Sequence, residues 1–274
     1  MTVPAMTATT PLTPAYARVA ELMPTLRVIE GEPRSGAGWT RGDHLADGGP
    51  ALDAFLADEA LAAVATYGAE PRSDVVATFA LHRYAWPAAA LFTVPYFTLR
   101  RVPRLAPEDV SLRRDPTRLT VRVTAFACLP SDPLARHPGA LVVPDEEALR
   151  AEVRRAAADH LGPLLDAFGP RMRRRSRALW GAATDELVES LWYFGHLLKE
   201  EERAVRELAR LLPGATPPFA VGAGFRELTT PEETTLRTRD RASCCMFYTL
   251  RPADTCATCP RLSDAERVRR LTGA

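Results

Sequence analysis

The chain has almost no lysine and almost no net charge. Its 35 basic and 34 acidic side chains leave a formal net charge of +1, and Lys199 is the only lysine. Such a balance produces no long-range field that would attract nucleic acid or an anionic membrane. The sequence also shows no helix-turn-helix pattern with a basic face. We therefore expect no nucleic-acid partner.

Long apolar runs and a targeting signal are missing as well. Residues 1–15 have neither a basic start nor an apolar core, so no secretory signal is expected. The longest apolar stretch, residues 85–99, is about 15 residues long, short of the roughly 20 that a membrane-spanning helix needs. We expect a cytoplasmic protein without a transmembrane segment, in which this stretch forms a buried helix.

The hydrophobic pattern predicts an α+β fold. Apolar residues recur at helical spacing in five segments: 15–23, 52–67, 73–99 with an interruption at Pro87, 145–168 with a stop at Gly169-Pro170, and 187–208. Residues 110–127 alternate with period two around Asp115-Pro116, which predicts a hairpin with one buried face. A short helix is expected over residues 263–271. We expect helices packed on a small antiparallel sheet, with a C-terminal cysteine-rich loop.

The composition divides the chain into three parts. Residues 1–49 form a Pro/Thr-rich tail, a helical segment and a Gly-rich linker, and residues 50–225 form a helix-rich α+β body. Residues 226–274 contain short extended pieces followed by the cysteines. No internal repeat is present, so we expect these three segments to be the units of the fold.

Cysteine is scarce, and four of the five cysteines lie close together near the C-terminus. Cys244 and Cys245 are adjacent, whereas Cys256 and Cys259 are separated by two residues. In a reducing cytoplasm, such a group is more typical of metal ligands or redox groups than of a disulfide framework. The fifth, Cys128, ends the predicted hairpin and is expected to be a small buried side chain.

The spacing of these four cysteines leaves three interpretations open. Cys256 and Cys259 have the separation found in zinc knuckles, but the adjacent pair does not fit that habit. Neighbouring side chains on a strand point to opposite faces, so both sulfurs reach one centre only if the chain turns sharply, and we predict an irregular loop over residues 243–246. A two-iron cluster spreads its thiolates over a larger volume. We favour a [2Fe–2S] cluster over zinc or over free thiols without a metal.

The cysteine motif resembles that of a known family. The run Arg241-x2-Cys244-Cys245-x2-Tyr248-x-Leu250-x5-Cys256-x2-Cys259 is similar to the C-terminal cluster motif of the FhuF-type ferric-siderophore reductases. Leu179-Trp180-Gly181 resembles the tryptophan-led segment of that family, with Ala182 where asparagine is often found. The resemblance extends over residues 70–262 and leaves the N-terminal quarter unmatched.

The resemblance implies a cytoplasmic oxidoreductase with a [2Fe–2S] cluster held by Cys244, Cys245, Cys256 and Cys259. The cluster would pass one electron, received from a donor such as a ferredoxin, to iron(III) in a ferric siderophore of the hydroxamate type. Iron(II) would then leave. No catalytic residue beyond the cluster is implied, and no substrate-binding residue is assigned. Two alternatives are a zinc- or iron–sulfur-stapled binding or sensor protein without reductase turnover, and a siderophore-binding scaffold in which the cluster has no role.

Several other side chains are candidates for supporting roles. Arg241 would raise the cluster potential if its charge lies near the thiolates, and Tyr248 would shield one side from water. The alternatives are a solvated base and a core side chain. Residues 171–177, rich in arginine, either dock an acidic electron donor or form a solvated helix start.

The remaining aromatic and histidine side chains are expected to have structural roles or none. The aromatic residues Trp180, Trp192 and Tyr193 are expected in the core rather than around a substrate, because aromatic residues at helical spacing usually pack there. His82 and His196 lie in apolar helical patterns and are expected to be buried. No function is predicted for the histidines in polar surroundings, His44, His137 and His160.

Overall fold

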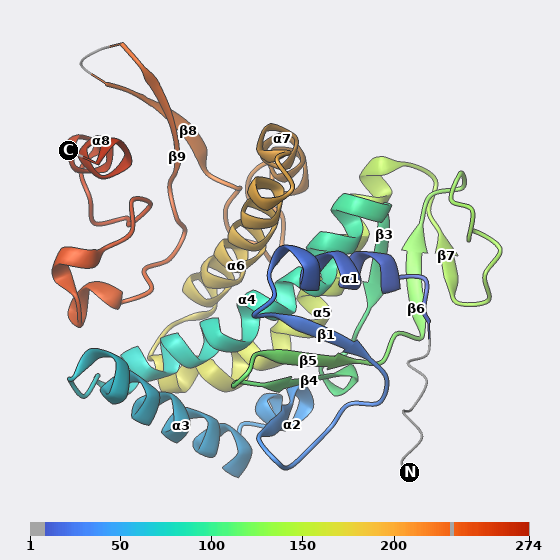
Figure 1. Ribbon diagram of the computed structural model, residues 1–274, viewed down its shortest axis with the longest axis horizontal. Helices are drawn as coiled ribbons and strands as arrows, with labels where there is room; N and C mark the ends of the chain where they lie inside the picture. The colour runs from blue at the N-terminus through green and yellow to red at the C-terminus, as the bar shows by residue number, and fades with distance from the viewer. Residues whose placement is uncertain (1–8, 231–232, 274) are drawn as a thin grey trace.

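The computed structural model describes residues 9–230 and 233–273, and its central element is helix α4 (Ser73–Leu99). Four other helices pack against it (Figure 1): α1 (Thr13–Leu22), α3 (Pro50–Tyr67), α5 (Glu146–Met172) and α6 (Ser176–Leu197). Nearly every α4 residue from Tyr84 to Phe97 is buried, which confirms the buried helix expected from the apolar stretch. Within the described ranges, no helix has the length and apolarity needed to cross a bilayer.

The predicted interruption at Pro87 is wrong, because α4 continues through both Pro87 and Pro95. A proline inside a helix leaves the carbonyl four residues earlier without its backbone partner. For Pro95 this carbonyl belongs to Leu91, and it accepts a hydrogen bond from the Tyr16 hydroxyl at 3.3 Å. For Pro87 it belongs to Arg83, an exposed position that water can reach. Partners outside the helix therefore replace the missing bonds.

The described residues form three small sheets, two of them in the body and the third a C-terminal hairpin, and the α+β prediction is confirmed. The first has the order β1 (Arg27–Glu30), β5 (Arg118–Val121), β4 (Val110–Arg113) and β2 (Trp39–Arg41), with only the β1–β5 pair parallel. The second has the order β3 (Arg101–Arg104), β6 (Ala125–Cys128) and β7 (Ala140–Val142). Two short elements, α2 (Gly42–Ala46) and η1 (Pro107–Asp109), lie between them in the chain.

The predicted hairpin over residues 110–127 is present but shorter. β4 and β5 pair antiparallel with Val110 opposite Val121, while β6 belongs to the second sheet. The expectation of a single buried face is wrong, because Ser111 and Thr120 on the other face are also buried. The connection between β1 and β2 covers them: the backbone N–H of Arg34 donates to the Ser111 hydroxyl at 2.9 Å.

The C-terminal half of the body contains three helices. The carboxylate of Asp145 accepts from the Ala148 N–H at 2.8 Å and caps α5, which runs past its predicted stop to Met172. The single helix predicted over residues 187–208 is divided into α6 and α7 (Glu201–Leu211) by Lys199, whose φ of 59° is left-handed. The two helices approach so closely at Gly195 that any Cβ there would overlap that of Ala204.

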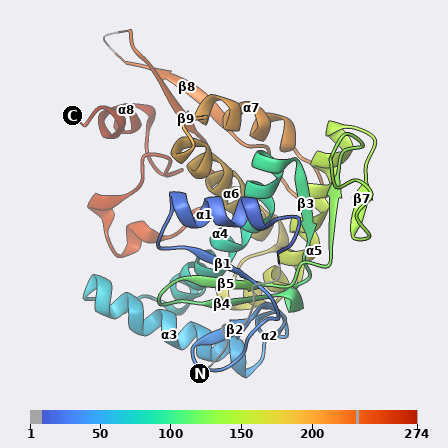
Figure 2. The same cartoon turned by 45° about the vertical axis from the view of Figure 1, so that its right-hand side comes forward.

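The C-terminal segment begins with a hairpin of β8 (Phe225–Thr229) and β9 (Thr235–Arg239). The turns η2 (Phe247–Thr249) and η3 (Pro252–Asp254) and helix α8 (Asp264–Thr272) follow. Figure 2 shows this segment, in orange and red, along one side of the helical body. α8 confirms the predicted short helix, and a capping box of Ser263 and Glu266 starts it. The division of the chain at residues 49 and 225 stays a prediction.

Candidate metal centre

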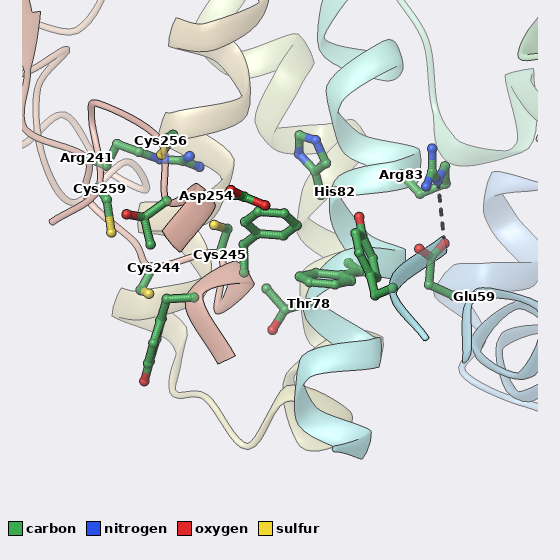
Figure 3. Close-up of a pocket in the computed structure, with 15 residues that line it drawn as sticks. Glu59, Thr78, His82, Arg83, Arg241, Cys244, Cys245, Asp254, Cys256 and Cys259 are labelled. Carbon is green, nitrogen blue, oxygen red and sulfur yellow. Dashed lines mark hydrogen bonds and ion pairs between the residues drawn. The ribbon is translucent and has the colours of Figure 1, made fainter. Parts of the chain in front are cut away.

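The four C-terminal cysteines line one pocket. This cavity of about 320 Å³ lies between the C-terminal segment and the helices α3 and α4 (Figure 3). Cys244 and Cys245 are half-buried, Cys259 is buried and Cys256 is exposed, and none forms a disulfide. The cysteines that lie close in sequence therefore also face a common space. The fifth, Cys128, is a buried core side chain far from this pocket in the chain, as predicted.

The backbone around the adjacent pair is irregular, which confirms the loop predicted over residues 243–246. No helix or strand includes Cys244 or Cys245, and Met246, which follows them, has a left-handed φ of 65°. Further along, the N–H of Cys259 donates to the carbonyl of Cys256 at 3.0 Å, which closes a tight turn. These two turns explain how sulfurs from both pairs reach the same pocket.

Arginine side chains hold this loop in place. Arg174, between α5 and α6, donates to the carbonyl of Cys244 at 3.1 Å, and Arg267 on α8 donates to the carbonyl of Cys259 at 3.3 Å. Arg270 donates to the carbonyl of Thr255. A segment without regular secondary structure must satisfy its carbonyl groups in such ways when they are shielded from water. One residue of the arginine-rich run, Arg174, thus has a structural contact next to a cysteine.

A buried carboxylate on α6 fixes the start of the loop. Asp185, with an exposed fraction of 0%, accepts hydrogen bonds from the N–H groups of Ala242 at 3.0 Å and Ser243 at 2.8 Å. It also accepts from the Ser243 hydroxyl at 2.7 Å and from the guanidinium of Arg239. Asp185 is not recognisable from the sequence, because an acid within a helical pattern carries no mark of a partner 58 residues away.

Arg241 and Tyr248, the two residues predicted beside the cluster, line the same pocket as the cysteines. Burial opposes the charge of Arg241, but the carboxylates of Asp185 and Glu189 and the Cys245 sulfur outweigh it and raise the pKa of Arg241. Its charge therefore persists beside the thiols. The guanidinium of Arg261 lies 4.1 Å from the centre of the Tyr248 ring. Their effects on potential and water access stay predictions.

The surroundings of the Cys245 thiol change its proton affinity. Burial raises its pKa, and the neighbouring sulfurs of Cys256 and Cys244 act in the same direction. The backbone N–H of Phe247 and the charge of Arg241 act against them. A metal that binds this sulfur must displace its proton, and Arg241 is the side chain that favours this loss.

Trp180 and Trp192 pack against the core, as expected, and away from the pocket. Trp180 meets Phe219 edge-on at 5.4 Å between ring centres, and Trp192 meets Phe225 at 5.2 Å. Tyr193 differs, because 42% of it is exposed. These aromatic side chains do not contribute to the wall around the cysteines.

The histidines differ from expectation. His82 and His196, predicted to be buried, are both exposed: their side chains project from α4 and α6 toward acidic partners, Glu186 and Glu201. His82 also lines the cysteine pocket. His160, expected in polar surroundings, is fully buried and bonded to Tyr84 and to a backbone carbonyl. The apolar pattern around His82 concealed a position that faces the pocket.

Comparison with known families supports one interpretation of this site. Residues 241–261 match the family model of the FhuF 2Fe-2S C-terminal domain. Residues 241–261 are similar to an FhuF-type 2Fe-2S domain. All four clustered cysteines fall within the match, which confirms the predicted resemblance and the [2Fe–2S] cluster as the cofactor. The FhuF-type family is associated with the reduction of ferric siderophores. No curated protein matches the chain.

The residues around the pocket fit such a cluster. The donors are four free thiols, the soft ligands that iron–sulfur clusters use, and the cationic side chain of Arg241 lies among them to balance a negatively charged group. The thiols are spread around the cavity: in the ranges that the structure describes, no three His, Cys, Asp or Glu side chains meet closely enough for one metal ion. The donor chemistry of this FhuF-type domain therefore agrees with its family.

Proposed function

We propose that the protein is a ferric-siderophore reductase that transfers one electron to iron(III) within its chelate and releases iron(II). The observation that supports this proposal is the shared pocket: the four cysteines and the wall formed by α3 and α4 face one cavity that opens to solvent at Cys256 and His82. An acceptor in this pocket lies next to the electron carrier, without protein between them.

Cys244, Cys245, Cys256 and Cys259 would hold the cluster, which when bound supplies one-electron transfer. The protein's part is to position this group and to set its potential. Asp185 and the loop arginines fix the backbone that carries the cysteines. Arg241 places a positive charge beside the sulfurs, which favours the reduced, more negative state.

The chemistry of iron explains why one electron is enough for release. Hydroxamate oxygens are hard ligands, and they bind the small trivalent ion far more tightly than the divalent one. Reduction therefore weakens every iron–oxygen bond of the chelate at once. No general acid or base is required for this step. We propose hydroxamate siderophores as the substrates.

We further propose a cytoplasmic location and an acidic donor of the ferredoxin type. A reducing compartment keeps the free cysteines available as ligands. The exposed arginines Arg173, Arg175 and Arg177 flank Arg174, which touches the carbonyl of Cys244. A basic surface this close to the cluster loop suits an acidic partner, because complementary charge accelerates docking.

The test is anaerobic purification followed by absorption and EPR spectra before and after dithionite. We expect a coloured protein whose visible bands bleach on reduction, and capture of iron(II) by a ferrous chelator when ferric desferrioxamine is added to the reduced protein. Cys259→Ser should abolish both, while Cys128→Ser, a matched change in the core, should retain both. A coloured protein that releases no iron(II) would favour the binding or sensor alternative, and a colourless or zinc-containing one would contradict the reductase.

A further inference from the structure

A single histidine enters the pocket from its α4 wall. His82 belongs to α4, and 58% of its side chain is exposed. It lines the main pocket and also a narrow cavity of about 20 Å³ that it shares with Cys244 and Cys245. Figure 3 places its imidazole on α4 between the cysteine loop and Arg83. A molecule that fills the pocket therefore meets this ring.

A buried carboxylate orients the ring. Nδ1 of His82 lies 3.0 and 2.9 Å from the two carboxylate oxygens of Glu186 on α6, and the side chain of Glu186 is only 8% exposed. The Nδ1–H must therefore donate to the carboxylate. Glu186 raises the pKa of His82, while the protein atoms packed around the ring and the charges of Arg241 and Arg83 oppose it. The pair keeps the imidazolium form accessible.

The other ring nitrogen is available to a ligand. Among the described residues, Nε2 of His82 has no hydrogen-bond partner, and in the imidazolium form it is a donor. The carboxylate of Glu59, which also lines the pocket, is already bound by Arg114 at 2.7 Å and by Arg83 at 3.5 Å. The Nε2–H group of the His82 imidazolium can therefore donate a hydrogen bond to a molecule in the pocket.

We propose that His82, oriented by Glu186, donates a hydrogen bond to the iron-bound oxygens of the chelate. The proposal rests on the proposed function. These oxygens retain negative charge, and a cationic donor binds such acceptors more strongly than a neutral one. Tyr67, Phe79 and Phe247 form an aromatic wall in the same pocket, with ring centres 5.6 to 6.4 Å apart, that can contact the organic part of the chelate. His82 is then a binding residue and Glu186 its positioning residue.

The test uses the gallium(III) complex of desferrioxamine E, a neutral trihydroxamate that cannot be reduced, titrated into the anaerobic holoprotein by calorimetry. Loss of one charge-assisted hydrogen bond in His82→Ala should raise Kd about tenfold. His82→Gln retains a neutral donor and should recover part of the affinity. His196→Ala is the matched control: its ring also bonds a glutamate through Nδ1, to Glu201 at 3.2 Å, but lies outside the pocket, so Kd should not change.

Glu186→Gln separates positioning from general stability. If Glu186 acts through His82, the substitution should weaken binding in the wild-type background and have no further effect in the His82→Ala background. Equal losses in both backgrounds would overturn the positioning role. Binding by His82→Ala as tight as by the wild type, or no binding by the wild type, would overturn the proposal. A wild type that binds the gallium complex but releases no iron(II) would contradict the reductase and leave the role of His82 standing.

Discussion

Replacing Asp185 by asparagine should release the start of the cysteine loop. Asp185 is fully buried and receives two backbone N–H groups, a hydroxyl and a guanidinium from residues 239–243. Asparagine has nearly the same shape, but only one of its two terminal atoms can accept hydrogen bonds. Its amide group would face a donor of Ser243 or Arg239. The substitution therefore replaces hydrogen bonds to a carboxylate oxygen by two donor groups that face each other, without altering the volume of the site.

The magnitude follows from what stays paired. Removing one partner of a buried ion pair costs about 3–5 kcal/mol, because the other charge is left uncompensated. Arg239 keeps the carboxylate of Glu189 at 2.7 Å and the carbonyl of Ala223 at 3.2 Å. Arg241, whose Nε lies 3.6 Å from Asp185, keeps Glu189 as a nearby negative charge, so neither guanidinium loses every counter-charge. We therefore expect the lower end, about 3 kcal/mol, which corresponds to about a hundredfold in an equilibrium constant.

Hydrogen exchange followed by mass spectrometry measures this directly. The amides of Ala242 and Ser243 donate to Asp185, so a peptide containing them should exchange about a hundredfold faster in Asp185→Asn. Peptides from the centre of α4 should be unchanged, since the lost bonds belong to the C-terminal segment. Iron should also be lost faster to a chelator, because the backbone of Cys244 is no longer held.

The control is Asp53→Asn, the same substitution in an exposed ion pair. Asp53 is 56% exposed and contacts Arg171 at 2.6 Å, and pairs of this kind contribute less than about 1 kcal/mol. Exchange around Ala242 should be the same in this variant as in the wild type. If Asp185→Asn protects that peptide as well as the wild type does, the carboxylate does not hold the loop, and the reasoning fails.

Three further predictions concern other parts of the chain. Burial lowers the pKa of His160 from 6.5 to about 4, so between these pH values the imidazole is protonated in the unfolded chain but not in the folded one. The free energy of unfolding should therefore fall by about 3 kcal/mol as the pH drops from 6.5 to 4. Urea unfolding of His160→Gln should lack this pH dependence. Gly195→Ala should cost about 1–3 kcal/mol in urea unfolding, because the new Cβ overlaps that of Ala204, whereas Gly214→Ala meets open space. Arg241→Gln should lower the cluster midpoint potential in a redox titration, by about 59 mV if the charge changes the one-electron equilibrium tenfold; an unchanged potential would remove Arg241 from this role.

Local signals in the sequence predicted local structure well. The helical patterns predicted from residue 145 and over residues 263–271 are present as α5 and α8, and in each the residue just before the helix caps it. The adjacent pair Cys244-Cys245 predicted an irregular loop because two neighbouring side chains can share one centre only through a sharp turn. In each case, the residues that decide the structure are neighbours in the chain.

Contacts between distant residues could not be predicted in this way. Arg174 and Cys244 are 70 residues apart, and no periodicity links them. The continuation of α4 past Pro95 depends on a hydroxyl from Tyr16, 75 residues before the carbonyl that it reaches. His82 was expected in the core because its neighbours are apolar, although α4 presents this position, like Thr78, Phe79 and Arg83, to the pocket. These features follow from how the helices pack against one another, and the spacing of residues along the sequence does not reveal that packing.

The two acids in the middle of α6 show what such packing adds to function. Consecutive residues on a helix point about 100° apart, so Asp185 and Glu186 face different neighbours. Asp185 binds the loop that carries Cys244, and Glu186 binds His82 on the α4 wall of the pocket. Both walls are therefore tied to adjacent positions of one rigid helix rather than to each other through a mobile loop. The separation between the two walls of the pocket is then set by α6, and a substitution at either acid should change one wall while leaving the other in place.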